Sequence, residues 1–386
     1  MKKHTKKIIA LLLAAVLQLT IVGCLYPSAC AAEIAEDTAP TIEGLTFVEE
    51  TELEYAECFH LYCYEGGYTY IAIVNGDDFL VVPENGQVPE NLDDSVTVLQ
   101  QPLDKIYLAA TSAMALFSAV DALDSVRMTG TRASGWYIDA AVDALNSGEM
   151  LFAGKYSEPD YEMLVGEGCN LAIESTMIYH TPKVKEMIED LDIPVLVDRS
   201  SYEPHPLGRT EWVKLYAVLV DKEEEAEAFF ETQASIVRAL DDFENTGKTV
   251  AFFYVNTDGS VVIRKPADYI PKMIALAGGK YAFEDFETDQ TGTAIRITME
   301  NFYAVAVDAD ILIYNSSISS PISSTSDLIA MDSLFTDFKA VQEGNVWCTV
   351  KSYYQATDDV GQMILDIHHV LTDGDESEIE FLTRVS

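Results

Sequence analysis

Arginine is scarce in this sequence and is concentrated in expected loops. The chain of 386 residues has 64 acidic and 24 basic side chains, with a formal net charge of −40 at pH 7. Five arginines fall in or near expected loops: Arg127, Arg132, Arg199, Arg209 and Arg264. A guanidinium group offers a planar fork of donors that suits carboxylate, catecholate or phosphate oxygens. Each is therefore a candidate to bind an anionic ligand, and a surface ion pair with one of the many acids is the alternative.

Other side chains could complete such a site. His205 lies between two prolines and could ligate haem iron or hydrogen-bond a ligand, although a loop histidine in this setting is more often structural. Tyr202 and Arg209 flank it. Aromatic rings could cover the flat or apolar parts of a ligand. The candidates of this kind are Trp136, Tyr137, Trp347, Tyr353 and Tyr354.

Catalytic and metal-binding motifs are absent from the sequence. It has no GxSxG, HExxH, Walker or GxGxxG pattern and no His/Asp/Glu cluster with ligand spacing. We therefore expect no enzymatic activity, no bound metal ion and no cofactor. The excess of acidic residues repels nucleic acid, which excludes that class of partner. The six cysteines have no CxxC spacing, so we expect Cys58 and Cys63 to be core-facing or free thiols.

The N-terminus has the pattern of a secretory signal. Four lysines precede an apolar run from Ile8 to Val22, and Gly23-Cys24 follows it. A small residue before a cysteine at this place resembles the lipobox of bacterial lipoproteins, which implies lipidation of Cys24. A plain signal peptide cleaved near Ala32 is the alternative. Residues 1–23 are then the signal and 24–40 a tether, and the mature protein is anchored to a membrane without crossing it.

The remaining chain alternates strands and helices. Short strands with turns occupy residues 41–82, and an apolar strand–loop–helix rhythm follows, which is typical of parallel βαβ units. An amphipathic helix is predicted from Lys222 to Asn245, with Asp221 and Glu224 as a capping pair. The fold class is α/β. We expect an N-terminal lobe over 41–220, a connecting helix over 221–247, a C-terminal lobe over 248–372 and an acidic tail over 373–386.

Two segments on opposite sides of this helix resemble each other. SEPDYEMLVGEGCNLAIEST and RITMENFYAVAVDADILIYNSS both predict a short helix followed by a buried strand with polar residues at its end. Glu162 and Glu300 begin the two helices. Such a repeat predicts two similar, Rossmann-like βα lobes with a ligand cleft between them. Because ligands bind beyond the carboxyl ends of strands in open α/β sheets, the side chains expected to face this cleft are Ser175, Thr176, Asn315 and Ser316.

The order of these parts resembles the substrate-binding lipoproteins of ABC importers for iron-siderophore, haem or cobalamin. The segments GWYIDAAVDAL, GKYSEPDYEML, IESTMI, DRSSYEPHPLGRTEWVKLY and DADILIYN carry the resemblance, which covers about Lys105 to Leu371. It implies a monomeric receptor whose partners are a small-molecule metal chelate and an ABC permease dimer with its ATPase. One glutamate on each lobe, here Glu162 and Glu300, would pair with permease arginines. A favourable interaction with the helix dipole is the simpler explanation of both.

The expected function is therefore that of a lipid-anchored, extracytoplasmic solute-binding protein. A ferric siderophore is the first choice of ligand, and haem and cobalamin remain open. A membrane-anchored extracellular enzyme, for example a hydrolase on a two-lobe scaffold, is the main alternative. A receptor for a sensor or adhesion system is a third.

Overall fold

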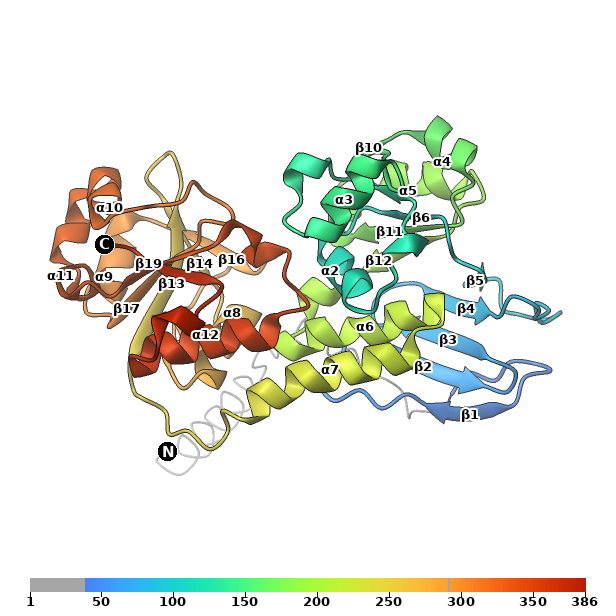
Figure 1. Cartoon of the computed structure of the whole chain (residues 1–386), viewed down its shortest axis with the longest axis horizontal. Coiled ribbons are helices and arrows are strands. Elements are labelled where there is room, and N and C mark those ends of the chain that lie inside the picture. Colours follow the sequence, from blue (N-terminus) through green and yellow to red (C-terminus); the bar gives the residue numbers. More distant parts are fainter. Residues whose placement is uncertain (1–38, 291) are drawn as a thin grey trace, which may run out of the picture. The chain divides into compact units, whose positions relative to one another are not determined.

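The computed structural model describes residues 39–290 and 292–386. The predicted signal, Cys24 and nearly all of the predicted tether lie outside these residues. The described chain contains three larger sheets and a two-stranded hairpin of β9 (Gly154–Lys155) and β10 (Glu158–Pro159) (Figure 1). No described helix is long and apolar enough to span a bilayer.

The first sheet has the order β1-β2-β3-β4-β5, and all neighbours are antiparallel except β4 and β5. The strands are β1 (Phe47–Glu50), β2 (Phe59–Tyr64), β3 (Tyr68–Ile73), β4 (Asp78–Val82) and β5 (Val96–Gln100). The predicted hairpin at Asn75-Gly76 is confirmed, and Asn75 adopts a φ of 55° in the turn. We expected an N-terminal lobe over residues 41–220, and within it these strands form a sheet separate from the parallel one.

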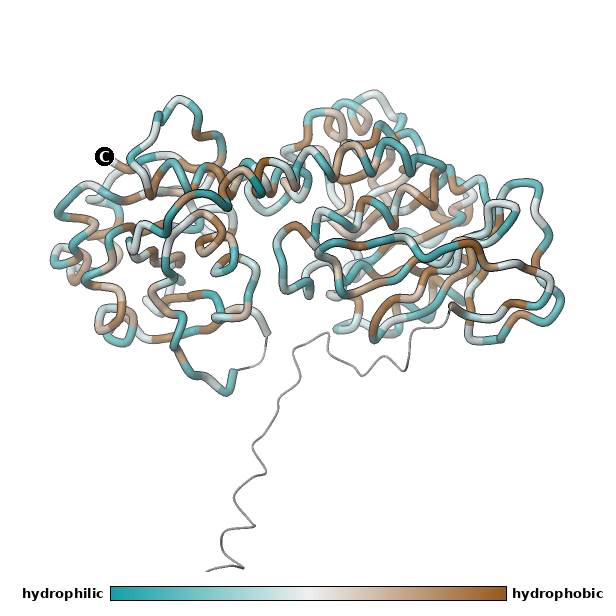
Figure 2. Tube along the Cα trace, turned by 90° about the horizontal axis from the view of Figure 1, so that it is seen from below, coloured by the Kyte–Doolittle hydropathy of each residue, from teal (hydrophilic) through white to brown (hydrophobic). Residues whose placement is uncertain are grey.

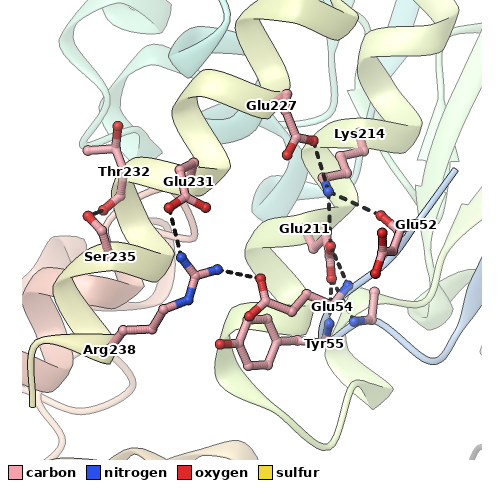
Figure 3. Close-up of polar contacts among 11 residues, drawn as sticks. Glu52, Glu54, Tyr55, Glu211, Lys214, Glu227, Glu231, Thr232, Ser235 and Arg238 are labelled. Carbon is pink, nitrogen blue, oxygen red and sulfur yellow. Dashed lines mark hydrogen bonds and ion pairs between the residues drawn. The ribbon is translucent and has the colours of Figure 1, made fainter. Parts of the chain in front are cut away.

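Buried carboxylates fix the segment before β2 to helix α6 (Pro206–Val220). Glu211 accepts the backbone N–H groups of Glu54, Tyr55 and Ala56, each at 2.8 Å (Figure 3). Lys214 lies 3.2 Å from Glu211 and 2.9 Å from Glu227 of the next helix. The segment before β2 is irregular, so no neighbouring strand accepts these backbone N–H groups. The carboxylate of Glu211 accepts them instead.

One cysteine differs from the expectation. Cys58, which is fully buried, is disulfide-bonded, whereas Cys63, Cys169 and Cys348 are free. Cys58 therefore faces the core as expected, but it is not a free thiol. Sequence spacing does not reveal which distant segments bring two cysteines within the roughly 4.4–6.8 Å Cα separation that a disulfide requires.

The second sheet is entirely parallel, with the order β12-β11-β6-β7-β8. Its strands are β6 (Ile106–Leu108), β7 (Met128–Thr129), β8 (Leu151–Phe152), β11 (Leu171–Ser175) and β12 (Val195–Asp198). Its helices, besides α6, are α2 (Thr111–Ala119), α3 (Asp139–Ser147), α4 (Tyr161–Glu167) and α5 (Pro182–Glu189). The prediction of parallel βαβ units is confirmed.

Helix α7 (Glu223–Arg238) leads to the third sheet. It is shorter than the predicted helix, and Asp221 is the left-handed C-cap of α6, with a φ of 56°, rather than the N-cap of α7. A sharp turn at Asp221 brings α7 alongside α6, and α7 also packs against α12 (Val360–Thr372) (Figure 1). Ala226, Phe230 and Val237 are buried, so its apolar stripe faces these two helices.

The third sheet has the order β16-β14-β13-β17-β18-β19, and β15 also pairs with β13. Its strands are β13 (Thr249–Val255), β14 (Val261–Arg264), β15 (Lys280–Tyr281), β16 (Ala294–Ile297), β17 (Ile311–Tyr314), β18 (Val346–Thr349) and β19 (Leu382–Arg384). Its other helices are α8 (Tyr269–Leu276), α9 (Met299–Ala306), α10 (Thr325–Met331) and α11 (Lys339–Glu343). Most residues of β13, β14, β17 and β18 are buried. Hydrophobic and hydrophilic stretches alternate along the trace in Figure 2.

The last strand corrects the predicted acidic tail. β19 pairs antiparallel with β18, and Phe381 and Leu382 are buried. The acids before it are solvent-facing residues of the connection from α12, so charge alone did not separate a tail from a folded segment. The second lobe therefore includes β19.

Short 3-10 turns complete the fold. They are η1 (Leu123–Ser125), η2 (Ala133–Gly135), η3 (Thr176–His180), η4 (Ser200–Tyr202), η5 (Ser333–Asp337), η6 (Lys351–Tyr354) and η7 (Glu376–Glu378). Of these, η2, η3 and η4 follow parallel strands of the first lobe and η6 follows β18 of the second. These four turns therefore lie where ligands bind in α/β sheets.

Candidate ligand-binding site

Three polar loops leave the first lobe at the same edge of its parallel sheet. Ser175 ends β11, Arg199 follows β12 and Arg132 follows β7. Because the strands are parallel, their carboxyl ends share one edge. β7 and β12 are three strand spacings apart, about 14 Å at ~4.8 Å per strand. The two arginines therefore border a region wide enough for a small-molecule chelate.

Arg132, Arg199 and Arg209 have no hydrogen-bonded or ion-paired carboxylate among the described residues. Instead, the Cζ atoms lie 3.9 Å, 4.9 Å and 4.2 Å from the ring centres of Phe152, Tyr202 and Tyr269, respectively. Stacking of this kind orients a guanidinium group without neutralising it.

The lack of hydrogen-bond partners matters most for the arginines whose guanidinium groups are partly buried. Arg199 is only 9% exposed, and the Nε atoms of Arg199 and Arg209 are buried without a hydrogen bond among the described residues. A buried cation without a partner is unfavourable by several kcal/mol, on the order of the cost of breaking a buried ion pair. Arg209 acts electrostatically on buried Asp268, which Arg264 also approaches. In a chain with 64 acids, arginines without a hydrogen-bonded or ion-paired carboxylate favour binding of an external anion.

Arg264 and Arg127 differ from these three. Arg264 ends β14, and its Nη1 lies 3.6 Å from Oδ2 of buried Asp268. Its Cζ lies 5.8 Å from the ring centre of Tyr269, which Arg209 also contacts. Arg127 donates to Glu167 at 2.9 Å and precedes β7. The structure therefore places Arg127 at the amino edge of the sheet, away from the candidate site.

In the second lobe, Asn315 and Ser316 follow β17 as predicted but serve the loop itself. Asn315 Oδ1 accepts the backbone N–H of Ser317 at 3.2 Å. Ser316 is fully buried, and its hydroxyl donates to the carbonyl of Thr349. Ser316 therefore holds the loop, whereas Asn315 both holds the loop and lines a pocket. A pocket beside them is lined by Phe252, Phe253, Tyr254, Val262, Ile263, Arg264, Ala294, Asn315 and Ile318.

The predicted aromatic residues occupy three kinds of position. Tyr137 is 47% and Tyr354 is 40% exposed, and their rings meet edge to face with centroids 6.3 Å apart. Trp136 and Tyr353 are buried beneath the same loops. Trp347 is buried near the amino end of β18 and stacks with Arg384, so it lies outside the site.

His205 has a structural role. Its Nδ1 accepts the backbone N–H of Leu207 at 3.2 Å and thereby caps α6, and its ring stacks on Tyr55 at 4.4 Å. Burial, together with nearby Lys272, lowers the pKa of His205 to about 4. The neutral imidazole is thus committed to the helix cap.

The remaining predicted residues lie at the turns η3 and η4, which follow β11 and β12. Ser175 Oγ accepts the backbone N–H of Met177 at 3.4 Å and caps η3, and Thr176 begins this turn. Tyr202 is 38% exposed beside Arg199.

Sequence reasoning missed Tyr269 and Gln355, which contact residues of the other lobe. The only sequence signal for Tyr269 is its place after Asp268, the N-cap of α8.

Glu162 and Glu300 occupy matching positions in the two lobes. Each lies exposed in the first turn of its helix, α4 or α9, before the strands β11 and β17. Asp160 and Thr298 are the respective N-caps. Within the described chain, neither glutamate has an ion-pair partner. The pKa of Glu300 is lowered by a hydrogen bond to its own backbone N–H and by the Thr298 hydroxyl.

Two archaeal proteins are similar to most of the chain. An uncharacterised lipoprotein of Methanocaldococcus jannaschii is 26% identical over 353 residues, covering 83% of this chain and 81% of that protein. A second lipoprotein of the same organism is 25% identical over 347 residues, covering 84% of each chain.

Solved structures share the fold. The periplasmic haem-binding protein HutB of Vibrio cholerae superposes with a TM-score of 0.56 at 14% identity, covering 69% of this chain and 98% of HutB. The petrobactin-binding protein YclQ from Bacillus subtilis gives a TM-score of 0.54 at 14% identity, covering 69% and 92%, respectively. The predicted two-lobe α/β fold is therefore confirmed.

No group of three or more His, Cys, Asp or Glu side chains in the described chain could hold a metal ion. The family model described as periplasmic binding protein matches residues 119–353, which include the predicted ligand loops of both lobes and both exposed glutamates. Members of this family bind solutes rather than transform them, which agrees with the prediction that the chain is not an enzyme. The chain belongs to the periplasmic binding protein family, whose structural relatives are substrate-binding proteins of ABC transporters.

Proposed function

We propose that this protein is a lipid-anchored, extracytoplasmic receptor that captures an anionic metal chelate and delivers it to an ABC permease. One observation carries the proposal. Arg132, Arg199 and Arg209 stack on aromatic rings near the ligand-binding edge, and in the described chain none of them has a hydrogen-bonded or ion-paired carboxylate, although the charge of Arg209 acts on buried Asp268. A chain with a net charge of −40 would otherwise repel such a ligand.

Charge and size favour a ferric siderophore over the other ligands. A ferric tricatecholate carries three negative charges on a compact body, which suits several guanidinium donors spread across about 14 Å. Haem presents two carboxylates at one edge and cobalamin lacks a comparable cluster of anionic oxygens. The similar proteins named for haem and petrobactin support a chelate of this general kind.

Glu162 and Glu300 are proposed as the two docking points for the permease dimer. Each is exposed on a separate lobe and begins a corresponding helix. A two-fold related permease would present the same arginine cluster to each lobe. Exposed ion pairs contribute little affinity, about 0–1 kcal/mol each, but two pairs fix the orientation of docking.

Membrane attachment is proposed through a diacylglyceryl group on Cys24. The sequence pattern and the similarity to proteins named as lipoproteins support this. A monomer would suffice, because one copy supplies both lobes and both docking glutamates.

Direct binding tests the ligand proposal. Quenching of tryptophan fluorescence would be followed with a ferric tricatecholate, haemin and cyanocobalamin. We expect the tricatecholate to bind most tightly, and Arg199→Gln and Arg209→Gln each to weaken it about tenfold or more, as expected for charge-assisted hydrogen bonds of ~1.5–3 kcal/mol. Arg384→Gln is the matched control, since Arg384 also stacks on a ring but is paired with Glu376 at 2.7 Å. Equal loss in all three variants, or tightest binding of cyanocobalamin, would overturn the proposal.

Charge reversal tests the docking proposal separately. The double variant Glu162→Lys, Glu300→Lys should bind the tricatecholate as the wild type does but fail to support uptake in cells that depend on this receptor. Normal uptake by the double variant would show that these glutamates do not dock the permease.

A further inference from the structure

Gln355 connects the two lobes through its side-chain amide. It follows η6 in the second lobe and is 1% exposed. Its Oε1 accepts the backbone N–H of Tyr137, and its Nε2 donates to the carbonyl of Gly135, each at 2.8 Å. The same Nε2 donates to the hydroxyl of Tyr354 at 2.8 Å. One buried amide thus bonds to a loop of the first lobe and to the adjacent tyrosine of its own.

The loop that Gln355 holds belongs to the candidate site. It comprises residues 131–138, begins with Thr131 and Arg132 after β7, and passes through η2 to Tyr137. Trp136 anchors it from within, donating Nε1–H to the Thr131 carbonyl at 3.1 Å. Gln355 adds the contact that sets where the end of this loop meets the second lobe.

The two tyrosines that Gln355 contacts are exposed, although the residues that precede them, Trp136 and Tyr353, are buried. Tyr137 and Tyr354 come from different lobes, and their planes lie at 83° to each other. Exposed aromatic rings that converge from two lobes offer apolar surface at a low cost in side-chain entropy. Gln355 bonds the backbone N–H of Tyr137 and the ring hydroxyl of Tyr354, so its amide fixes the spacing of the two rings.

We propose that Gln355 is a positioning residue for the ligand: it holds Tyr137 and Tyr354 as an aromatic pair that covers an aromatic or apolar face of the bound chelate. This inference rests on the proposed receptor function. It assigns the arginines to the anionic oxygens of the ligand and the tyrosine pair to its carbon surface.

The contact needs an amide in particular. Gly135 offers a carbonyl and Tyr137 an N–H, so the residue between them must donate and accept at once. A glutamate at this position would place a carboxylate beside the Gly135 carbonyl, and a leucine would leave both backbone groups without a partner. Either change releases the loop at a buried position.

Contact between the lobes does not depend on Gln355 alone. Thr210 Oγ1, in α6, donates to the Thr357 carbonyl at 2.9 Å, and Arg209 stacks on Tyr269. Replacing Gln355 should therefore loosen the loop of residues 131–138 while the lobes stay joined. This separates a positioning role from a general structural one.

The test combines a ligand-free and a ligand-dependent measurement on the full chain. Hydrogen exchange at the amide of Tyr137 would be compared in wild type, Gln355→Leu and Gln342→Leu, the last altering an exposed glutamine of the same lobe. Stopped-flow dissociation of a ferric tricatecholate would be measured for the same proteins. Gln355→Leu should speed exchange at Tyr137 and raise the dissociation rate about tenfold. Its Tm should be lower than that of Gln342→Leu, because two buried backbone groups lose their partners, but unfolding should remain a single transition. Tyr137→Ala should raise the dissociation rate similarly, with no further increase when combined with Gln355→Leu.

The outcomes distinguish the positioning role of Gln355 from the receptor function of the protein. Unchanged exchange at Tyr137, or faster exchange with an unchanged dissociation rate, refutes the positioning role while the receptor function stands. A large fall in Tm with normal dissociation assigns Gln355 to stability and also refutes it. Failure of the wild type to bind the tricatecholate, haemin or cyanocobalamin refutes the receptor function, and the positioning role is rejected with it.

Discussion

Glu174 provides a quantitative test of how the first lobe is built. It lies on β11, one residue before the polar end of the strand, and is fully buried. Neither of its carboxyl oxygens has a hydrogen-bond partner in the described chain. It points to the same face as Ala172, which belongs to an apolar cluster with Tyr107 and Leu164. Desolvation by burial raises the pKa of Glu174 to about 8.

This shift predicts how stability changes with pH. The unfolded chain has a pKa of 4.5 at this residue, so between pH 4.5 and about 8 the folded state holds a proton that the unfolded state has released. The free energy of unfolding therefore falls as pH rises, by about 1.4 kcal/mol per unit. The stabilisation is fully present below pH 4.5 and is lost by about pH 8. Over this window the loss is on the order of 4–5 kcal/mol.

Glu174→Gln removes the titration but keeps the shape of the side chain. Urea unfolding of the wild type and the variant would be measured from pH 5 to 9, with the exposed Glu186→Gln as the control. We expect the variant to gain stability relative to the wild type by about 1.4 kcal/mol per pH unit, levelling off near pH 8. Parallel profiles for wild type and variant would show that the carboxyl group is not protonated in the folded lobe, and would refute the reasoning.

Three further predictions concern the elements around the site. Glu211→Ala leaves three partly buried N–H groups without an acceptor and should lower the free energy of unfolding by about 3–5 kcal/mol. Exposed Glu227→Ala should cost less than about 1 kcal/mol. Urea titration distinguishes the two variants, and equal losses would contradict the role of Glu211. The pKa of His205 is depressed to about 4, so the wild type should lose stability as pH falls from 6.5 towards 4. His205→Asn keeps a capping side chain and should remove that part of the acid sensitivity, which denaturation at pH 4.5 and 7 measures; an unchanged pH difference would count against it. Because α7 packs along both α6 and α12, ligand should change the radius of gyration little in small-angle scattering, and a marked contraction would argue against a rigid connection.

Much of the fold could be predicted because the relevant signals are local. The buried strand over Thr249–Val255 is found at those residues, and the turn at Asn75-Gly76 gives the predicted hairpin. Boundaries were less accurate where a cap has two possible uses. Asp221 could begin one helix or end another, and its left-handed backbone conformation ends α6. The docking of β1–β5 as a separate sheet depends on the distant acids Glu203 and Glu211, which sequence reasoning could not pair with the segment.

For the candidate site, too, residues with a local sequence signal could be proposed, whereas contacts between distant segments could not. Arginine scarcity and expected loop position made Arg132, Arg199 and Arg209 candidates, although Arg209 lies in the first turn of α6 rather than in a loop. Arg127 precedes its strand rather than following it, so strand direction could have excluded it from the sequence alone. Trp347 needed the structure, because its contact with Arg384 depends on the pairing of β18 with β19. Gln355 and Tyr269 also act across the lobes, and local sequence carries no signal for such contacts.

The position of bound iron tests the central claim most directly. Crystals grown with a ferric tricatecholate would be measured at the iron absorption edge, where anomalous scattering locates the metal without assumptions about the ligand. The proposed site predicts a single strong peak bordered by the guanidinium groups of Arg199 and Arg209 and by the tyrosine pair. A peak among surface carboxylates, or none at that place in crystals that contain the chelate, would contradict it.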